Sequence, residues 1–590
     1  MSYRAPIEKM LFAMTHVANM DASIENGLYA DLGEGAVQVI LEEAAKFANE
    51  RLAPLNKIGD KQGIVFKDGI VQTPDGWQKT YQDWSDAGWN GLASSSEFGG
   101  QGLPILLNAA CSEMWNAANM AFALNPLLSC GAVEALQAHG TAELQKKYLI
   151  KLISGQWTGT MNLTEPQAGS DLSSLRTKAV KQDNGTYLIS GTKIYITYGE
   201  HDLAQNIIHL VLARLPDAPH GTRGISLFLV PKFLVNEDGL LGERNDVRCS
   251  GIEHKLGIHA SPTCTMIYGD AGGAVGWLIG EENKGLACMF TMMNNARLNV
   301  GIQGVAIAER AYQQAIEFAK TRRQGRAIGS TSGSSALNMN AIIDHPDVKR
   351  MVLDMRSKTS AARAICYVTA AKLDKSHHLE NENLKRIAFE EASLLIPLAK
   401  AFSTDIGVEV ASTGIQVHGG MGYVEETGAA QYLRDAHIAT IYEGTNGIQA
   451  IDLIARKLSQ SGGDTVKSIL RDYADIAARF AQFDTRPATI LTDAVKILSL
   501  TTDWMLETFQ TKPNDALAGA TPYLRLFSLV AGGAYLAKAV LSAKQCDHPF
   551  MLEARQDCQF LIENHVIMAG ALSASIMDGV NTINGFRSEL

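Results

Sequence analysis

Residues 186–197 read TYLISGTKIYIT, an alternating run of β-branched and aromatic residues that is typical of a β-strand. Similar short runs follow at 207–213, 224–231 and 263–268, with Gly, Pro, Asn and Asp between them. No helical pattern separates these runs, so a parallel sheet with crossover helices is not expected. We therefore predict an antiparallel β domain over residues 157–282.

Helical patterns lie on both sides of this β domain. Apolar residues recur at helical spacing in residues 34–53, 76–90, 104–153, 301–322, 346–374 and 381–412. The sequence thus predicts an α+β chain with an N-terminal α-helical domain (1–156), the β domain and a four-helix bundle (283–458). A loop, SQSGGD, then precedes an additional C-terminal helical domain (464–590). Four such units agree with a length of 590 residues, which is too long for one hydrophobic core.

The composition is that of a soluble globular protein, with 46% hydrophobic and 19% charged residues. The net charge of −10 argues against a nucleic-acid binder, and the C-terminal domain itself carries 11 Lys or Arg against 14 Asp or Glu. The eight cysteines form no CxxC pair and the histidines no zinc pattern, so we expect reduced thiols and no metal site. No signal peptide and no membrane-spanning stretch of about 20 apolar residues is expected, which favours the cytoplasm.

Two motifs lie in the predicted β domain. The segment MNLTEPQAGSD (161–171) contains a Pro and a Gly that favour a turn with exposed backbone N–H groups. Such a loop could hold an electron-rich heterocycle or an anionic oxygen, or it could simply cap a strand at the surface. In IYITYGEHD (194–202), Tyr195 and Thr197 fall on one face of a strand and could flank a flat ring, although an ordinary half-buried strand has the same pattern.

Two further motifs lie at predicted helix ends. The segment KTRRQGRAIG (320–329) places Arg322 and Gln324 where a guanidinium could pair with a pyrophosphate, or could complement the helix dipole. The glycines of QVHGGMGYVEE (416–426) allow close approach of the backbone to a ligand, and a loop that ends a helix has the same pattern. No strand precedes them, whereas a dinucleotide fingerprint requires one.

The fifth motif is IYEGTNGIQA (441–450), in which Glu443 precedes a turn. A lone Glu before a turn carries little information, because such residues are commonly solvated or serve as capping partners.

Together, these five motifs in this order resemble the acyl-CoA dehydrogenase family over about residues 34–456. The C-terminal extension is similar to that of the larger branch of the family. Three positions differ from the usual pattern: Tyr195 stands where Trp is frequent, Gly325 and Arg326 where Phe and Gly are frequent, and Gly447 where Gln is frequent.

The resemblance implies FAD as the cofactor. The residues implied to contact it are Met161, Leu163, Thr164, Ser170, Tyr195, Thr197, Arg322, Gln324, Gln416, Gly420 and Thr445. Arg322 and Gln324 would bind the pyrophosphate of a neighbouring subunit's FAD, and Gln416 and Gly420 would hold the adenosine half.

The resemblance also implies a catalytic base and a substrate site. Glu443 would remove the α-proton of the acyl thioester, and Ser170, Arg297 and Gly444 would bind the acyl-CoA. Some family members carry the base on an earlier helix, near the present Asn295, whose amide cannot take a proton. Backbone donors would stabilise the developing enolate, and burial would raise the pKa of Glu443.

The expected reaction is the α,β-dehydrogenation of an acyl-CoA, of medium to long chain, to trans-2-enoyl-CoA in fatty acid β-oxidation. Electrons would pass to an electron-transferring flavoprotein, and a homo-oligomer, expected to be a dimer, would complete the FAD site. Three alternatives remain open: an acyl-CoA oxidase, a dehydrogenase specific for methylthiopropionyl-CoA, and a DNA-binding flavoprotein relative.

Overall fold

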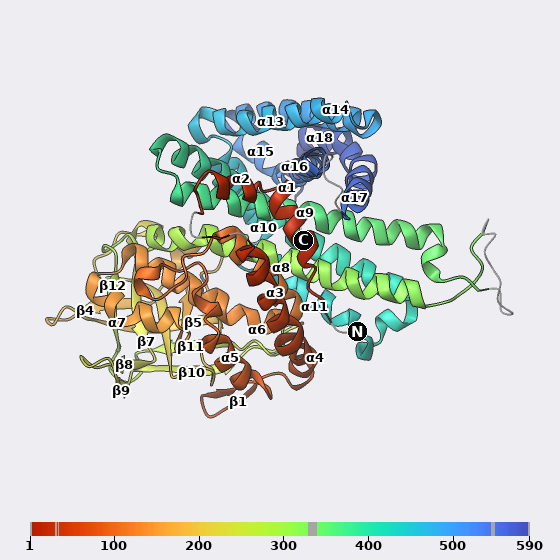
Figure 1. Ribbon diagram of the computed structural model, residues 1–590. Helices are drawn as coiled ribbons and strands as arrows, with labels where there is room; N and C mark the ends of the chain where they lie inside the picture. The colour runs from red at the N-terminus through yellow and green to blue at the C-terminus, as the bar shows by residue number, and fades with distance from the viewer. Residues whose placement is uncertain (1–2, 30–31, 34, 329–338, 544–548, 588–590) are drawn as a thin grey trace. The chain divides into compact units, whose positions relative to one another are not determined.

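The computed structural model describes residues 3–29, 32–33, 35–328, 339–543 and 549–587. Backbone contacts divide the chain into two compact units. The helical unit comprises Met1–Ala45, Ile105–Ala117 and Arg297–Leu590, and the sheet unit comprises Lys46–Pro104 and Ala118–Ala296. Helical, β, helical and again helical segments follow one another along the chain, which confirms the predicted α+β fold class (Figure 1).

The helices before the sheet are less continuous than their sequence pattern suggests. The predicted helix over 104–153 consists of α6 (Ile105–His139) and α7 (Ala142–Ile153), and α6 is itself interrupted at Asn119. Asn119 has φ −159° and ψ 90°, and its Oδ1 accepts the Phe122 N–H at 3.1 Å, which caps the second half of the helix. Apolar periodicity continues through this break, so the pattern alone did not reveal it.

Eight strands form the central sheet of the sheet unit, in the order β10-β11-β5-β12-β7-β6-β3 with β4 paired to β5 and β6. The strands are β3 (Trp157–Asn162), β4 (Lys178–Lys181), β5 (Tyr187–Thr197), β6 (Asn206–Arg214), β7 (Ile225–Pro231), β10 (Val247–Ile252), β11 (Thr263–Tyr268) and β12 (Ala274–Ile279). Every residue of β7 and nearly every residue of β6 is buried, which explains why these two runs are mostly apolar and do not alternate with polar residues.

The sheet differs from the prediction in strand direction. Most neighbours are antiparallel, but β3 runs parallel to β6 from Trp157 opposite Asn206 to Asn162 opposite Val211, and β4 meets β6 in parallel as well. Composition and alternation carry no information about the direction of the partner strand, so the purely antiparallel expectation was wrong for this edge. Met161 and Asn162 still belong to β3, and the loop that follows begins at Leu163, at the end of this edge strand.

Long helices make up the bundle of the helical unit: α8 (Gly285–Thr321) from Arg297 onward, α9 (Pro346–His378), α10 (Glu382–His418) and α11 (Ala429–Ala439). Helices α8 and α10 cross very closely. A Cβ atom on Gly301 would lie 2.5 Å from the Ala399 carbonyl oxygen, and one on Gly304 would lie 2.2 Å from that of Ser403. Glycine at these two positions therefore fixes the distance between the two helices.

The C-terminal domain is built around α16 (Ala520–Ala543). The surrounding helices are α13 (Asp464–Phe480), α14 (Thr485–Thr511), α15 (Pro513–Ala518), α17 (Met551–Asn564), α18 (Ala569–Asp578) and α19 (Val580–Asn584). By length and composition α16 and the segment Met551–Asn584 could cross a membrane, which corrects the expectation that no stretch comes close to this size. In α16, however, 89% of the apolar window is buried within the structure, as in the core helix of a globular domain.

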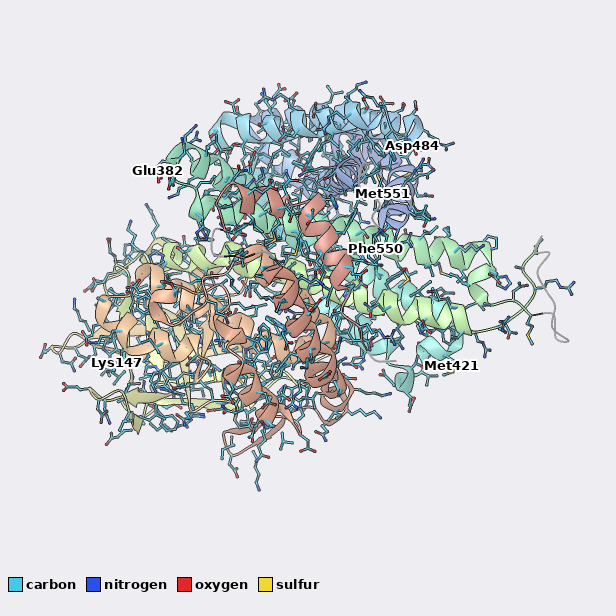
Figure 2. All side chains as sticks on the ribbon, in the orientation of Figure 1. Lys147, Glu382, Met421, Asp484, Phe550 and Met551 are labelled. Atoms are coloured by element: carbon cyan, nitrogen blue, oxygen red, sulfur yellow. The ribbon has the colours of Figure 1, made fainter. Side chains whose placement is uncertain are left out.

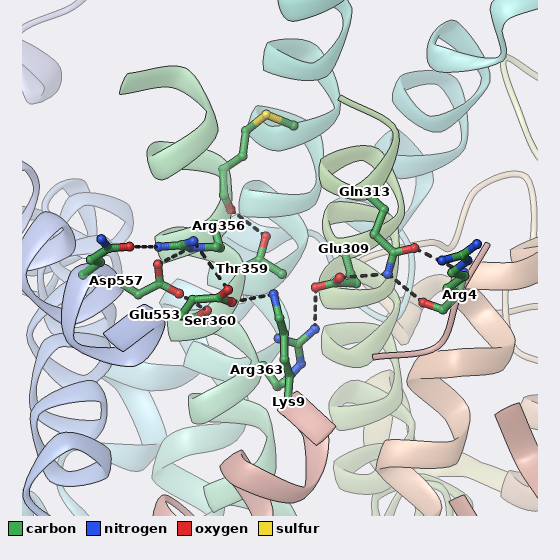
Figure 3. Close-up of polar contacts among 12 residues, drawn as sticks. Arg4, Lys9, Glu309, Gln313, Arg356, Thr359, Ser360, Arg363, Glu553 and Asp557 are labelled. Carbon is green, nitrogen blue, oxygen red and sulfur yellow. Dashed lines mark hydrogen bonds and ion pairs between the residues drawn. The ribbon is translucent and has the colours of Figure 1, made fainter. Parts of the chain in front are cut away.

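The N-terminal helix α1 (Ile7–His16) packs against this C-terminal domain. Figure 3 shows Lys9 paired with Glu553 of α17 at 2.5 Å, beside the pair that Arg356 forms with Asp557. Lys538 of α16 also donates to the Val17 carbonyl at 2.7 Å. Helix α1 is thus an integral part of the helical unit.

Candidate active site

Glu443 lies in a tight turn between α11 and α12 (Asn446–Asp452). Its φ of 56° and the φ of 83° at Gly444 place two successive residues in the left-handed region, which is unfavourable for glutamate. Glycine is favoured at 444 because other residues are strained at φ 83°, and a Cβ there would also lie 2.9 Å from Nε2 of Gln449. Thr445 caps α12 by accepting the Ile448 N–H at 3.3 Å. A strained glutamate held by its neighbours is a feature typical of active sites.

Two buried side chains hold the backbone of this turn through hydrogen bonds. Gln449 is fully buried, and its Nε2 donates to the carbonyl oxygens of Glu443 at 3.1 Å and Gly444 at 3.3 Å. Lys400 of α10, also fully buried, donates from Nζ to the Gly444 carbonyl and to Asn446 Oδ1, both at 2.9 Å. The backbone of the turn therefore has little freedom to move.

Two opposing effects act on the pKa of Glu443. Burial raises the pKa of this half-buried carboxyl group, while the positive charges of Arg297 and Lys400 lower it, and the net direction is upward. A carboxylate with a raised pKa is a stronger base than one in water. The carboxylate can accept a proton, and the nearby charges of Arg297 and Lys400 stabilise it before it does so.

Arg297, a predicted substrate residue, lies on α8 with 4% of its surface exposed. Its Nη1 pairs with Asp452 at 2.8 Å, and Asp452 also accepts from Arg456 Nε at 2.5 Å. Within the described part of the chain, Nε of Arg297 has no hydrogen-bond partner although it is buried. The structure thus places Arg297 and Gly444 together with Glu443.

In the sheet unit, the loop after β3 is anchored by a buried ion pair. Glu165 accepts from Lys193 Nζ at 2.8 Å, and the same ammonium donates to the Leu163 carbonyl at 3.1 Å. Although burial alone would raise the pKa of Glu165, Lys193 and several hydrogen bonds lower it to about 2. Thr164 is tied to β5 as well, because its carbonyl oxygen accepts the Ile194 N–H at 3.0 Å.

This anchoring joins the loop to an irregular part of β5. The pairing register of β5 with β11 shifts between Cys264 and Met266, a β-bulge at which Tyr195 adopts φ 60°. The Tyr195 ring is 60% exposed, whereas Thr197 is half-buried. Met161, Leu163, Thr164, Tyr195 and Thr197 thus lie within one connected part of the sheet unit, and the exposed Ser170 follows on the same loop.

The remaining predicted cofactor residues lie at one end of the bundle. The rings of Phe318, in the last turn of α8, and His418, at the end of α10, are 4.6 Å apart. This contact brings the exposed Arg322 and Gln324 to the same end as Gln416 and Gly420. Met421, labelled in Figure 2, is 52% exposed in the turn that follows α10. Here Gly422 is required by packing, because a Cβ would lie 2.2 Å from the Ile415 carbonyl oxygen.

Sequence reasoning missed two charged residues near these sites. Lys400 is a single Lys within an apolar helical pattern, and nothing nearby marks it as functional. Glu134 of α6 accepts a hydrogen bond from Asn295, and burial raises the pKa of Glu134 to about 8. Asn295 itself cannot take a proton, but it contacts a carboxyl group that can.

Four family models cover most of the chain. They describe the acyl-CoA dehydrogenase N-terminal domain (36–156), middle domain (160–271) and C-terminal domain (283–459), and an acetyl-CoA dehydrogenase C-terminal-like domain (469–586).

Individual proteins give a consistent result. The chain is 46% identical over 547 residues to 3-methylmercaptopropionyl-CoA dehydrogenase of Ruegeria pomeroyi, covering 92% of both chains. Among solved structures, acyl-CoA dehydrogenase of Bacillus anthracis complexed with FAD matches with a TM-score of 0.74 at 21% identity, covering 93% of this chain and 89% of that one. A chain in the structure of the electron transferring flavoprotein of Acidaminococcus fermentans matches with a TM-score of 0.58 at 28% identity, covering 72% and 97%.

The chain belongs to the acyl-CoA dehydrogenase family, whose members are FAD-dependent oxidoreductases. The residues present fit a flavin. In the sheet unit, Met161 in β3, Leu163 and Thr164 of the following loop, and the exposed Tyr195 offer apolar and aromatic groups suited to a flavin ring. In the helical unit, Arg322 offers an exposed guanidinium suited to a phosphate.

Proposed function

We propose that the protein dehydrogenates an acyl-CoA thioester between the α and β carbons, with Glu443 as the base that removes the α-proton. The observation that carries this proposal is the single carboxyl group on a left-handed turn, held by Lys400 and Gln449 and accompanied by two buried cations. FAD supplies the acceptor for the β-hydrogen when it is bound.

The position of Glu443 suits the proposed proton transfer. Its pKa is raised by burial, so the carboxylate binds a proton more strongly than it would in water. Arg297 and Lys400 counteract burial and keep the ionised form accessible before the reaction. Because both residues are almost inaccessible to water, their charges are weakly screened at this site.

For the substrate we propose a short acyl group that carries a thioether, as in 3-methylmercaptopropionyl-CoA. The support is the 46% identity over 92% of both chains to a protein of that name. A medium- or long-chain fatty acyl group is the second candidate, and its support is the C-terminal helical domain, which is typical of the larger family branch.

The rate of anaerobic flavin bleaching separates the two substrates. Purified holoprotein would be mixed with 3-methylmercaptopropionyl-CoA, butyryl-CoA, octanoyl-CoA and palmitoyl-CoA in turn. We expect the first to bleach the flavin fastest. A rate at least tenfold higher with octanoyl- or palmitoyl-CoA would favour the fatty acyl assignment, and no bleaching by any thioester would refute the dehydrogenase function.

As the electron acceptor we propose an electron-transferring flavoprotein. The support is the family resemblance and the likeness to a chain in a solved structure titled for such a protein. An oxidase would instead pass electrons to oxygen. Stoichiometric hydrogen peroxide production during turnover in air would overturn this part of the proposal.

We further propose a homodimer in the cytoplasm that acts in β-oxidation. Arg322 and Gln324 follow α8, and the exposed Met421 and Tyr423 follow α10, at the end where Phe318 contacts His418. This end of the bundle therefore offers both apolar and charged groups to a second subunit. The described cysteines are free thiols, in keeping with a reducing compartment. A monomeric mass in solution with full FAD content would contradict the shared cofactor site.

A further inference from the structure

Lys400 is a lysine without access to water that contacts the turn bearing Glu443. Its Nζ donates to the Gly444 carbonyl and to Asn446 Oδ1, each at 2.9 Å. Asn446 in turn donates from Nδ2 to Asp405 Oδ1 at 2.7 Å. The ammonium group is therefore joined to the turn on one side and, through Asn446, to α10 on the other.

The backbone of Lys400 is fixed by the close crossing of α8 and α10. Lys400 lies between Ala399 and Ser403, the two residues whose carbonyl oxygens contact Gly301 and Gly304 of α8. Little backbone movement is possible there, since added atoms at either glycine would overlap α10. The backbone of α10 thus fixes the position of Lys400, and Lys400 fixes the turn through its hydrogen bond to the Gly444 carbonyl.

We propose that Lys400 is a positioning residue for Glu443: it holds the left-handed turn through the Gly444 carbonyl and places a buried positive charge beside the carboxylate. This inference rests on the proposed role of Glu443 as the base. An apolar side chain would fill the same space without the cost of burying an ammonium group. The contact to the Gly444 carbonyl is what the lysine adds.

Three charged groups face Lys400. They are Glu443 in the turn, Asp405 on α10 and Arg297 on α8. Burial, together with Arg297, lowers the pKa of Lys400 to about 7, while Glu443 and Asp405 act in the opposite direction. The charge on Lys400 is therefore coupled to the charge on Glu443. When Glu443 takes up a proton, Lys400 binds its own proton less strongly.

The test replaces Lys400 by neutral residues in the full-length holoprotein. Lys400→Met keeps the shape and removes both the charge and the donor, and Lys400→Gln removes the charge but keeps a polar donor. Lys538→Met is a matched control, because Lys538 also donates from a partly buried ammonium to a backbone carbonyl, that of Val17 at 2.7 Å. The measurement is the limiting rate of anaerobic flavin bleaching by a saturating acyl-CoA between pH 5.5 and 9.

Loss of an opposite charge at close range raises a carboxyl pKa by about 1–3 units. We therefore expect the acid limb of the rate profile, where Glu443 becomes protonated, to move upward by at least about one pH unit in both neutral variants. At a pH below the shifted limb, the flavin of the neutral variants should be bleached at least about tenfold more slowly than that of the wild type. Lys538→Met should keep the wild-type profile. FAD content and the far-ultraviolet circular dichroism spectrum report whether each variant is folded.

Two results would overturn the inference. One is a folded neutral variant, either Met or Gln, with the wild-type acid limb and rate. The other is an equal loss of rate in the Lys538 control, which would show a general effect on the fold. If the wild-type protein is not bleached at all, the proposed function fails first, and that outcome is distinct from both.

Discussion

The buried pair Glu165–Lys193 offers a sharp test of how the sheet unit holds its loop. Both side chains are almost inaccessible, with 3% and 0% exposure, and their charged atoms are 2.8 Å apart. Glu165 also accepts the Arg176 N–H at 2.7 Å and the Thr177 N–H at 3.0 Å. Replacing Lys193 by Met would leave this carboxylate buried without its counter-ion.

The expected cost follows from the burial. Removing one partner of a buried ion pair destabilises a protein by about 3–5 kcal/mol, because the remaining charge loses its compensation. Glu165 can reduce this cost by becoming protonated, and burial lowers the pKa of Lys193 to about 8. The destabilisation of Lys193→Met should therefore be largest near pH 7, where both groups are charged in the wild type, and smaller near pH 5. The double variant Glu165→Gln/Lys193→Met removes both charges and should recover at least about 2 kcal/mol relative to the single variant.

Urea unfolding followed by circular dichroism measures these free energies, and the four proteins of the cycle give the coupling energy directly. FAD content of the same samples tests whether the loop after β3 contributes to the proposed flavin site, since Lys193 also contacts the Leu163 carbonyl. A Lys193→Met variant within about 1 kcal/mol of wild type at pH 7, with full FAD content, would refute the assigned role of the pair.

Three further predictions concern single residues. Arg322→Ala should weaken FAD retention on dilution without lowering thermal stability, and unchanged FAD affinity would show that this exposed guanidinium does not contact the pyrophosphate. Gly444→Ala should destabilise the turn by about 1–2 kcal/mol, because alanine is strained at φ 83° and its Cβ would approach Gln449; equal stability in urea would contradict the geometry. Because the pKa of Glu134 is raised to about 8, the folded state keeps a proton that the unfolded state releases. The folded protein therefore loses stability through this group as pH rises from about 4.5 to 8. Glu134→Gln should remove that loss and exceed wild type in thermal stability at pH 8.5, and a wild-type pH dependence in this variant would count against it.

Much of the fold was predictable because strong periodicity coincides with burial. The strands β5, β6, β7 and β11 were recognised from runs that fill the interior of the sheet, and the bundle helices from their apolar stripes. The short hairpins β1–β2 (Val65–Lys67 and Ile70–Gln72) and β8–β9 (Phe233–Val235 and Leu241–Arg244) were missed, since three or four partly exposed residues carry no clear pattern.

The site was predictable only where residues adjacent in sequence carry it. The segment at 441–450 indicates Glu443 only through the family resemblance that it helps to carry, and the structure supplies the left-handed turn around it. Lys400 and Arg297 could not be linked to Glu443 from periodicity, because three separate helical segments bring them together and each is an isolated charge in an apolar pattern. Glu134 was missed for the same reason, since it meets Asn295 across 161 residues of chain.

The central claim is that the carboxyl group of Glu443 removes the α-proton. The most direct test is anaerobic bleaching of the FAD bound to Glu443→Gln by the best acyl-CoA, compared with wild type at equal FAD content. The glutamine is isosteric but cannot act as a base, and loss of a general base costs about 10²–10⁴ in rate. We predict bleaching at least 100-fold slower with acyl-CoA still bound; complete bleaching at the wild-type rate would contradict the assignment.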